Sequence, residues 1–260
     1  MDSLETELER ARALDVDELA DAIEAIGFEC TRCGACCKSE ADDPHTATVF
    51  PDEVRRVQSA GDAERDWREV ARPMPYGITD GDDGPTGETF EWALQTDACG
   101  DCAFYEEDES GTGACTVHED RPLICETYPF SVGLAGTSQP MGEVVDSVAL
   151  GAHREAGDTT DAGDADDADD AGDDAAGPDD AEGTVRAHEC EGLGRDIDRE
   201  DAESLAAALK ERAVREVEEA IGVRDAYEPR TVEGGEVVVH DSEGAKRPDG
   251  RAVDDGDAKG

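Results

Sequence analysis

The residues with the clearest chemical potential in this 260-residue chain are its nine cysteines. Four of them stand in one run, CTRCGACC, at residues 30–37. Two residues between successive cysteines let a tight turn present both sulfurs to one metal ion, while backbone N–H groups donate to the thiolates. Cys36 and Cys37 are adjacent, and in an extended backbone their side chains diverge, so the two can serve different metal atoms. This run predicts a metal site.

The other five cysteines follow at wider intervals. Cys99 and Cys102 bracket another two-residue gap, and the remaining three are Cys115, Cys125 and Cys190. The first residues of the chain are acidic and form neither a basic nor an apolar segment, so they do not resemble a secretory signal. We therefore expect a cytoplasmic location, where thiols stay reduced and clustered cysteines are more often metal ligands or redox centres than structural disulfides.

These motifs together resemble the YkgJ-type cysteine cluster proteins, whose C-x-x-C-x-x-C-C domain is described as zinc- or iron-chelating. The resemblance runs from Phe28 to about Gly194. Besides the cysteines, it depends on Tyr-Pro-Phe at residues 128–130 and on Cys-Glu-Gly-Leu-Gly at residues 190–194. The chain departs from the family pattern at Ala103, Glu126 and Glu191, where the family often has Pro, Arg and Pro.

The resemblance implies eight ligand cysteines. They are Cys30, Cys33, Cys36, Cys37, Cys102, Cys115, Cys125 and Cys190. Eight thiolates divide into two sets of four, which suits two four-thiolate zinc sites, a thiolate-bridged zinc pair or iron–sulfur clusters. Cysteines at successive two-residue gaps are commoner around a cubane, so the pattern favours an iron–sulfur cluster slightly over zinc and leaves both open. Two closed sets leave no coordination position free for catalysis by zinc.

Four residues near the ligands are candidates for extra or supporting roles: Cys99, His118, His188 and Arg121. Cys99 lies outside the family pattern, and a spare thiol is a simpler interpretation than a redox pair with Cys102. We expect each histidine to support the ligands or lie at the surface rather than bind metal, because eight thiolates already suffice. Arg121 can offset the negative charge of the thiolates.

Few elements are available to position these residues. Apolar spacing predicts a helix in two pieces over residues 3–26 and a longer helix over 200–221. Alternation predicts a strand over 88–96, whereas the segment 77–88, rich in Gly, Asp and Thr, is predicted to be a loop. We therefore expect a small, irregular, metal-stapled α+β fold that is mainly helical with a few short strands.

The composition limits how much of the chain can fold without a metal. Leu, Ile, Val and Phe make up about 16% of the residues and the formal net charge is −46, a combination typical of disordered chains. Bound metal can offset this deficit, since structural zinc contributes on the order of 10 kcal/mol or more to folding. The expected segments are an N-terminal helical segment (1–27), the cysteine cluster domain in two parts (28–156 and 183–240), a disordered acidic insertion (157–182) and a disordered tail (241–260).

The charge also indicates the surroundings in which the protein functions. The chain has 69 acidic and 23 basic residues, and only four of the basic residues are lysine. At about 1 M salt the Debye length is about 3 Å, which screens the self-repulsion of such a chain, so we expect a halophilic, archaeal source. No stretch approaches the roughly 18 apolar residues needed to span a membrane, and no basic patch suggests nucleic acid as a partner.

The sequence thus predicts a cytosolic protein whose partners are metal ions, and it identifies no protein partner. One alternative is an iron–sulfur oxidoreductase or electron-transfer protein. A second comes from the resemblance, because a related cysteine domain occurs in enzymes that N-methylate flagellin lysines, which suggests an accessory role in protein lysine methylation. The chain has no glycine-rich strand–turn–helix motif for a nucleotide-like cofactor, and whether it is an enzyme stays open.

Overall fold

The computed structural model describes residues 3–39, 45–61, 64–134, 143–151 and 183–253, and it divides into two compact units. Unit 1 consists of Met1–Cys30 and Thr127–Ala213, and unit 2 of Thr31–Glu126 and Val214–Gly260. The acidic insertion predicted at 157–182 lies outside the described residues. Within the described part, the helices are all too short or too polar to cross a membrane.

The prediction of a mainly helical fold is wrong. The described residues form six α-helices and twelve strands in four sheets, with 36% of residues helical and 26% in strands. The strands contain only two to six residues, which is too short for a clear period-two pattern. Strands β3 (Ile78–Gly81) and β4 (Gly84–Thr89) even pair inside the segment predicted to be a loop, where Gly, Asp and Pro hide the strand signal.

Unit 1 is built on an antiparallel sheet with the strand order β8-β10-β9. The strands are β8 (Phe130–Gly133), β9 (Val144–Ala149) and β10 (Thr184–His188). The predicted helix over 3–26 forms in two pieces, α1 (Leu4–Ala13) and α2 (Val16–Ile26). The helix predicted over 200–221 is confirmed as α7 (Arg199–Ala226), which contributes residues to both units.

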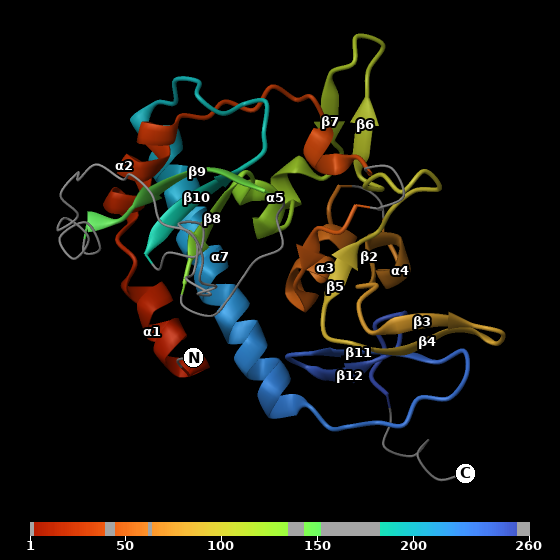
Figure 1. Ribbon diagram of the computed structural model, residues 1–260. Coiled ribbons are helices and arrows are strands. Elements are labelled where there is room, and N and C mark those ends of the chain that lie inside the picture. Colours follow the sequence, from red (N-terminus) through yellow and green to blue (C-terminus); the bar gives the residue numbers. More distant parts are fainter. Residues whose placement is uncertain (1–2, 40–44, 62–63, 135–142, 152–182, 254–260) are drawn as a thin grey trace, which may run out of the picture. The chain divides into compact units, whose positions relative to one another are not determined.

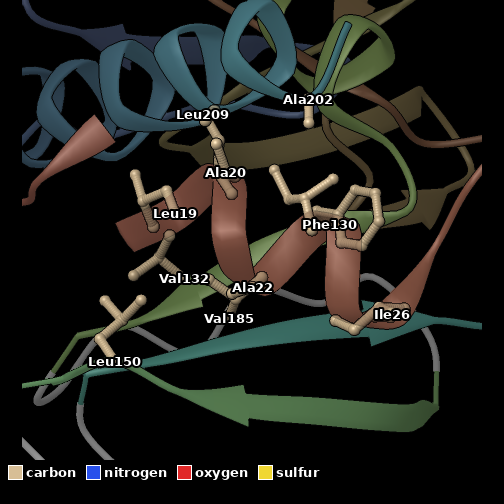
Figure 2. Close-up of a cluster of buried hydrophobic side chains, with 13 residues drawn as sticks. Leu19, Ala20, Ala22, Ile26, Phe130, Val132, Leu150, Val185, Ala202 and Leu209 are labelled. Atoms are coloured by element: carbon tan, nitrogen blue, oxygen red, sulfur yellow. The ribbon is translucent and has the colours of Figure 1, made fainter. Parts of the chain in front are cut away.

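The core of unit 1 lies between its sheet and its helices. In Figure 2, Leu209 of α7 points toward α2, while Val132 and Val185 extend from strands β8 and β10. The ring of Phe130 lies in the same cluster and meets the ring of Phe28 edge-on, with ring centroids 5.7 Å apart. Small residues such as Ala on α2 and α7 let these helices approach closely, so a chain poor in large apolar residues still forms a closed core.

Unit 2 contains three small sheets. The first has the order β1-β5-β2, the second β12-β11-β4-β3, and the third is the hairpin β6-β7. The strands not yet given are β1 (Thr48–Val49), β2 (Ala71–Pro73), β5 (Trp92–Leu94), β6 (Tyr105–Glu107), β7 (Gly113–Cys115), β11 (Val237–Asp241) and β12 (Gly244–Lys246). Figure 1 shows β11 and β12, in blue, beside β3 and β4, in gold, and β11 pairs in parallel with β4. The last segment of the chain, predicted to be a disordered tail, therefore supplies strand β12 to this sheet.

The core of unit 2 contains aromatic residues and cysteines in one cluster. The helices of this part of the chain are α3 (Pro51–Gln58), α4 (Trp67–Val70) and α5 (Leu123–Thr127), with 3₁₀ turns at Ala35–Cys37 (η1) and His118–Asp120 (η2). Trp67 and Trp92 meet edge-on with ring centroids 5.0 Å apart, and Cys102 and Phe104 are buried in the same cluster. The interior of unit 2 is thus continuous with the environment of its thiols.

A buried ion pair fastens the C-terminal strands to this core. Lys246 is 5% exposed and its Nζ lies 2.7 Å from an oxygen of Asp241, which is 1% exposed. The same Asp241 oxygen accepts a hydrogen bond of 2.8 Å from Trp92 Nε1, and Lys246 Nζ lies over the ring of Trp67. Both charges are therefore compensated where water cannot reach them.

Candidate metal centre

The part of the first cysteine run that follows Cys33 forms a tight turn in unit 2. Gly34 takes a left-handed conformation with φ of 75°, and the turn η1 follows, closed by a 2.9 Å hydrogen bond from the Cys37 N–H to the Gly34 carbonyl. The backbone at Cys36 and Cys37 is therefore not extended, and their sulfurs lie 3.9 Å apart. Two thiolates on one tetrahedral zinc lie about 3.8 Å apart, given Zn–S bonds of about 2.3 Å, so the pair can serve one metal ion.

Three more cysteines of unit 2 come to this turn from separate segments. The Cys102 N–H donates a 2.8 Å hydrogen bond to the Cys37 carbonyl, which joins the two cysteine segments directly. Cys115 ends strand β7, and Cys125 lies in helix α5. Cys37, Cys115 and Cys125 all pack against the buried cluster that contains Cys102. Four segments of the chain thus bring five thiols together.

The adjacent pair Cys36 and Cys37 is electrostatically coupled. The pKa of Cys36 is lowered to about 7, chiefly by a hydrogen bond from the Cys37 thiol and to a smaller extent by the charge of Arg121. The same hydrogen bond, together with burial and the charges of Cys102 and Cys125, raises the pKa of Cys37 far above its ordinary value. At neutral pH and without metal, Cys36 is therefore partly ionised whereas Cys37 stays protonated.

The remaining three thiols are held protonated by burial and by one another. The pKa of Cys102 is raised to about 11, chiefly by burial and to a smaller extent by the charges of Cys115 and Cys36. Burial also raises the pKa of Cys115 and of Cys125, and in Cys125 the charges of the other thiols contribute next. Such mutual repulsion is what a bound cation would remove, so this donor set suits a thiophilic metal.

Backbone N–H groups face the sulfurs in a recurring local pattern. The N–H of Phe104 opposes the rise in the pKa of Cys102, and the N–H of Val117 does the same for Cys115. In unit 1, the N–H of Gly192 donates to the sulfur of Cys190 at 3.4 Å. In each case the donor stands two residues after the cysteine, an arrangement that stabilises a thiolate and is suited to metal ligation.

Cys30 and Cys190 belong to unit 1, on segments that lie side by side. The Glu29 N–H donates a 3.1 Å hydrogen bond to the Gly192 carbonyl, and Phe28 pairs with Leu193 as an isolated antiparallel bridge. Cys30 is exposed and Cys190 is half-buried. Cys33 lies in unit 2 and is half-buried. Their role as ligands stays a prediction from the sequence pattern.

The four residues predicted to have extra or supporting roles lie in different environments. Cys99 is exposed in a turn closed by Asp97, whose carboxylate accepts from the Cys99 N–H at 2.7 Å. His188 is buried in strand β10, where its Nε2 lies 2.8 Å from the hydroxyl of Ser131, so it belongs to the core of unit 1. Arg121 acts on the thiols through its charge, and His118 lies at the surface within hydrogen-bond distance of the Arg121 guanidinium.

Two residues that the sequence did not single out also support the thiols. His45 is half-buried, burial lowers its pKa, and the backbone of Cys36 opposes that shift. Glu53 is fully buried in helix α3 and contributes to the raised pKa of Cys125 through its charge. Glu53 stands at the third position of a helix that starts at Pro51, and that proline marks the helix start in the sequence, whereas nothing local marks His45.

The free thiols do not enclose a metal position. Within the described residues, no three side chains of His, Cys, Asp or Glu already converge closely enough to hold an ion. The five thiols of unit 2 are instead near one another in charge-coupled positions, with two sulfurs at the spacing of one metal's ligands. The chemistry of the donor set therefore fits zinc or iron, and binding requires the thiols to move closer together.

Comparison with known proteins agrees with this chemistry. The CxxCxxCC family, whose description is "Putative zinc- or iron-chelating domain", matches residues 29–158, which is half of the chain and includes every cysteine except Cys190. No curated protein and no solved structure matches the chain. The resemblance seen in the cysteine spacing is confirmed for the cysteine domain, and the chain belongs to the CxxCxxCC family of metal-chelating domains.

Proposed function

We propose that this protein binds zinc or an iron–sulfur cluster through thiolates, with Cys36, Cys37, Cys102, Cys115 and Cys125 forming the centre in unit 2. The observation that carries the proposal is that these five thiols, from four segments, lie near enough to one another to interact through their charges, and that four of them lie in or against one apolar cluster. Cysteines that merely filled a core would have no need of mutual proximity, of facing backbone N–H groups or of a nearby arginine.

The energetics of these thiols favour a role in folding. Without metal, four of the five thiols have a raised pKa and are therefore protonated. Neutral thiols contribute little to the interactions that hold their chain segments together. A bound cation replaces the protons and ties the η1 turn, the Cys102 turn, strand β7 and helix α5 to one point. In a unit with few large apolar residues, this contribution decides whether the segments hold together.

The sequence pattern assigns Cys30, Cys33 and Cys190 as further ligands, and we retain that assignment as part of the proposal. Eight thiolates then provide two sets of four, for two zinc ions or for iron–sulfur clusters. The five thiols of unit 2 exceed the four that a single zinc takes, which allows one thiolate to be shared between metal atoms. A structural or carrier role follows for zinc, and electron transfer becomes the function of interest for an iron–sulfur cluster.

The test is anaerobic purification of the full chain in molar salt, followed by analysis of zinc, iron and sulfide and by a visible spectrum of the same sample. We expect stoichiometric zinc in a colourless protein, or iron and sulfide in a brown one. Cys102→Ser is expected to lose metal, because Cys102 is buried among the other thiols. Cys99→Ser is the matched control and should keep the wild-type metal content, because Cys99 is exposed in a separate turn. Equal metal loss in both variants, or a wild-type protein without metal, would refute the proposal.

A further inference from the structure

The carboxylate of Glu53 is buried beside the thiols without being one of the sulfur ligands. The residue is 1% exposed, and its two oxygens accept hydrogen bonds from two backbone N–H groups. Oε2 accepts from Phe50 at 3.0 Å, at the start of helix α3, and Oε1 accepts from Leu123 at 2.8 Å. Leu123 is the first residue of helix α5, which carries Cys125. Glu53 thus connects the beginnings of two helices, one of which presents a thiol.

Arg56, one turn later on α3, binds the loop of residues 120–123, which leads into helix α5. Its Nη2 lies 3.4 Å from Glu53 Oε1 and donates to the Arg121 carbonyl at 3.0 Å, while its Nε donates to the Asp120 carbonyl at 3.4 Å. Glu53 and Arg56 together fix three main-chain groups between residues 120 and 123. This loop joins Cys115 to Cys125 and carries Arg121, whose charge acts on Cys36 and Cys115.

Burying the Glu53 carboxylate costs free energy, so its hydrogen-bond partners have to account for its presence in the core. Burial raises the pKa of Glu53, whereas the Phe50 and Leu123 N–H groups and the charge of Arg56 oppose that rise. Removing a carboxylate from water is unfavourable unless its oxygens are fully hydrogen-bonded, and an apolar side chain would fill the same space without this cost. The acceptors are therefore needed for the loop rather than for packing.

We propose that Glu53 is a positioning residue of the metal centre, which sets the place of the Cys125 sulfur and of the Arg121 guanidinium by fixing the main chain between them. This inference rests on the proposed function of the thiols, and it adds a carboxylate that binds no metal itself. Groups that orient metal ligands by hydrogen bonds typically change metal affinity 10- to 100-fold when they are altered.

The test uses Co²⁺ as the probe, added to the reduced, metal-free, full-length chain in molar salt under anaerobic conditions. The thiolate-to-cobalt absorption gives the stoichiometry, and competition with a chelator gives the affinity. In Glu53→Gln, the amide nitrogen faces one of the two N–H donors, so one backbone hydrogen bond is lost while the shape is kept. We expect the affinity to fall by about 10- to 100-fold with the stoichiometry unchanged.

Asp241→Asn is the matched control. Asp241 is equally buried in unit 2, and its oxygens also accept hydrogen bonds from protein donors, which are Trp92 Nε1, Lys246 Nζ and the Glu243 N–H. We expect it to lower the resistance to urea while leaving the affinity for Co²⁺ within twofold of wild type. If both variants weaken Co²⁺ binding alike, Glu53 acts only through stability and the inference fails.

The two failures can be told apart. A wild-type chain that takes up no Co²⁺ refutes the proposed function and this inference with it. A wild-type chain that binds, together with Glu53→Gln of unchanged affinity, refutes the inference alone. If Glu53→Gln does not fold, Glu53→Asp replaces it, since it keeps the charge but withdraws the oxygens by about one bond length. Its affinity should also fall at least severalfold, and wild-type affinity in Glu53→Asp overturns the inference.

Discussion

Gly34 is the position at which a single substitution is expected to disturb the geometry of the cysteine turn most. Its φ of 75° lies in the left-handed region, which costs a residue with a Cβ atom about 1–2 kcal/mol. A Cβ atom placed there would also lie 2.1 Å from the hydroxyl oxygen of Tyr105 and 2.4–2.6 Å from two atoms of its ring. Overpacking of this kind typically costs about 1–3 kcal/mol. We therefore expect Gly34→Ala to lower the free energy of unfolding by about 2–5 kcal/mol.

Gly111→Ala separates these two effects. Gly111 lies in the loop between β6 and β7 with a φ of 82°, and nothing lies within 4 Å of an added Cβ atom. This variant should lose only the backbone contribution, about 1–2 kcal/mol. Unfolding by urea in molar salt gives both values. The difference between them is then the clash with Tyr105, about 1–3 kcal/mol.

Tyr105→Ala tests the source of the clash. In the Gly34→Ala background it should cost less than in the wild-type protein, by the same 1–3 kcal/mol or so, because the ring that opposes the new methyl group is gone. Gly34→Ala should also bind less metal, since the Gly34 carbonyl accepts the hydrogen bond that closes the turn before Cys37. Equal losses in Gly34→Ala and Gly111→Ala, with metal content unchanged, would refute this account of the turn.

Two further predictions concern the C-terminal strands. Lys246→Met leaves the buried Asp241 without its cation, so the free energy of unfolding by urea should fall by about 3–5 kcal/mol, and a loss below about 1 kcal/mol would contradict the buried pair. Arg55 and then Lys246 lower the pKa of Glu243 to about 2, so its contribution to stability is present above its ordinary pKa of 4.5 and disappears as the pH falls toward about 2. In this pH window, the urea midpoint of Glu243→Gln should depend less on pH than that of the wild-type protein. This difference should shrink with added salt, because Glu243 is partly exposed. A pH dependence equal to that of the wild type would argue against the ion pair.

The turn in the cysteine run and the main helices are the parts that the sequence predicts well, whereas the ligand roles of the cysteines stay a prediction. A C-x-x-C spacing favours a local turn, and a turn forms at Gly34 and continues through Cys37. The apolar positions of α2 and α7 likewise repeat at helical spacing over more than two turns. Both signals are local, and neither needs knowledge of the rest of the fold.

The sheets and the supporting residues depend on contacts distant in the sequence. Strand β4 finds its parallel partner β11 about 150 residues later, and neither strand is long enough to be recognised alone. Glu53 is one of 69 acidic residues, and its burial follows only from the approach of Leu123. The proximity of the Cys36 and Cys37 sulfurs was missed for a local reason instead, because a 3₁₀ turn replaces the extended backbone from which divergence was expected.

The most direct test of the central claim is X-ray absorption at the metal edge of the purified full-length protein. We predict a first coordination shell of four sulfurs per metal at about 2.3 Å, for zinc and for iron alike. In Cys102→Ser this shell should lose sulfur or the metal should be absent, whereas in Cys99→Ser it should be unchanged. A first shell of nitrogen and oxygen at about 2.0–2.2 Å in the wild-type protein would contradict the claim that its thiols bind the metal.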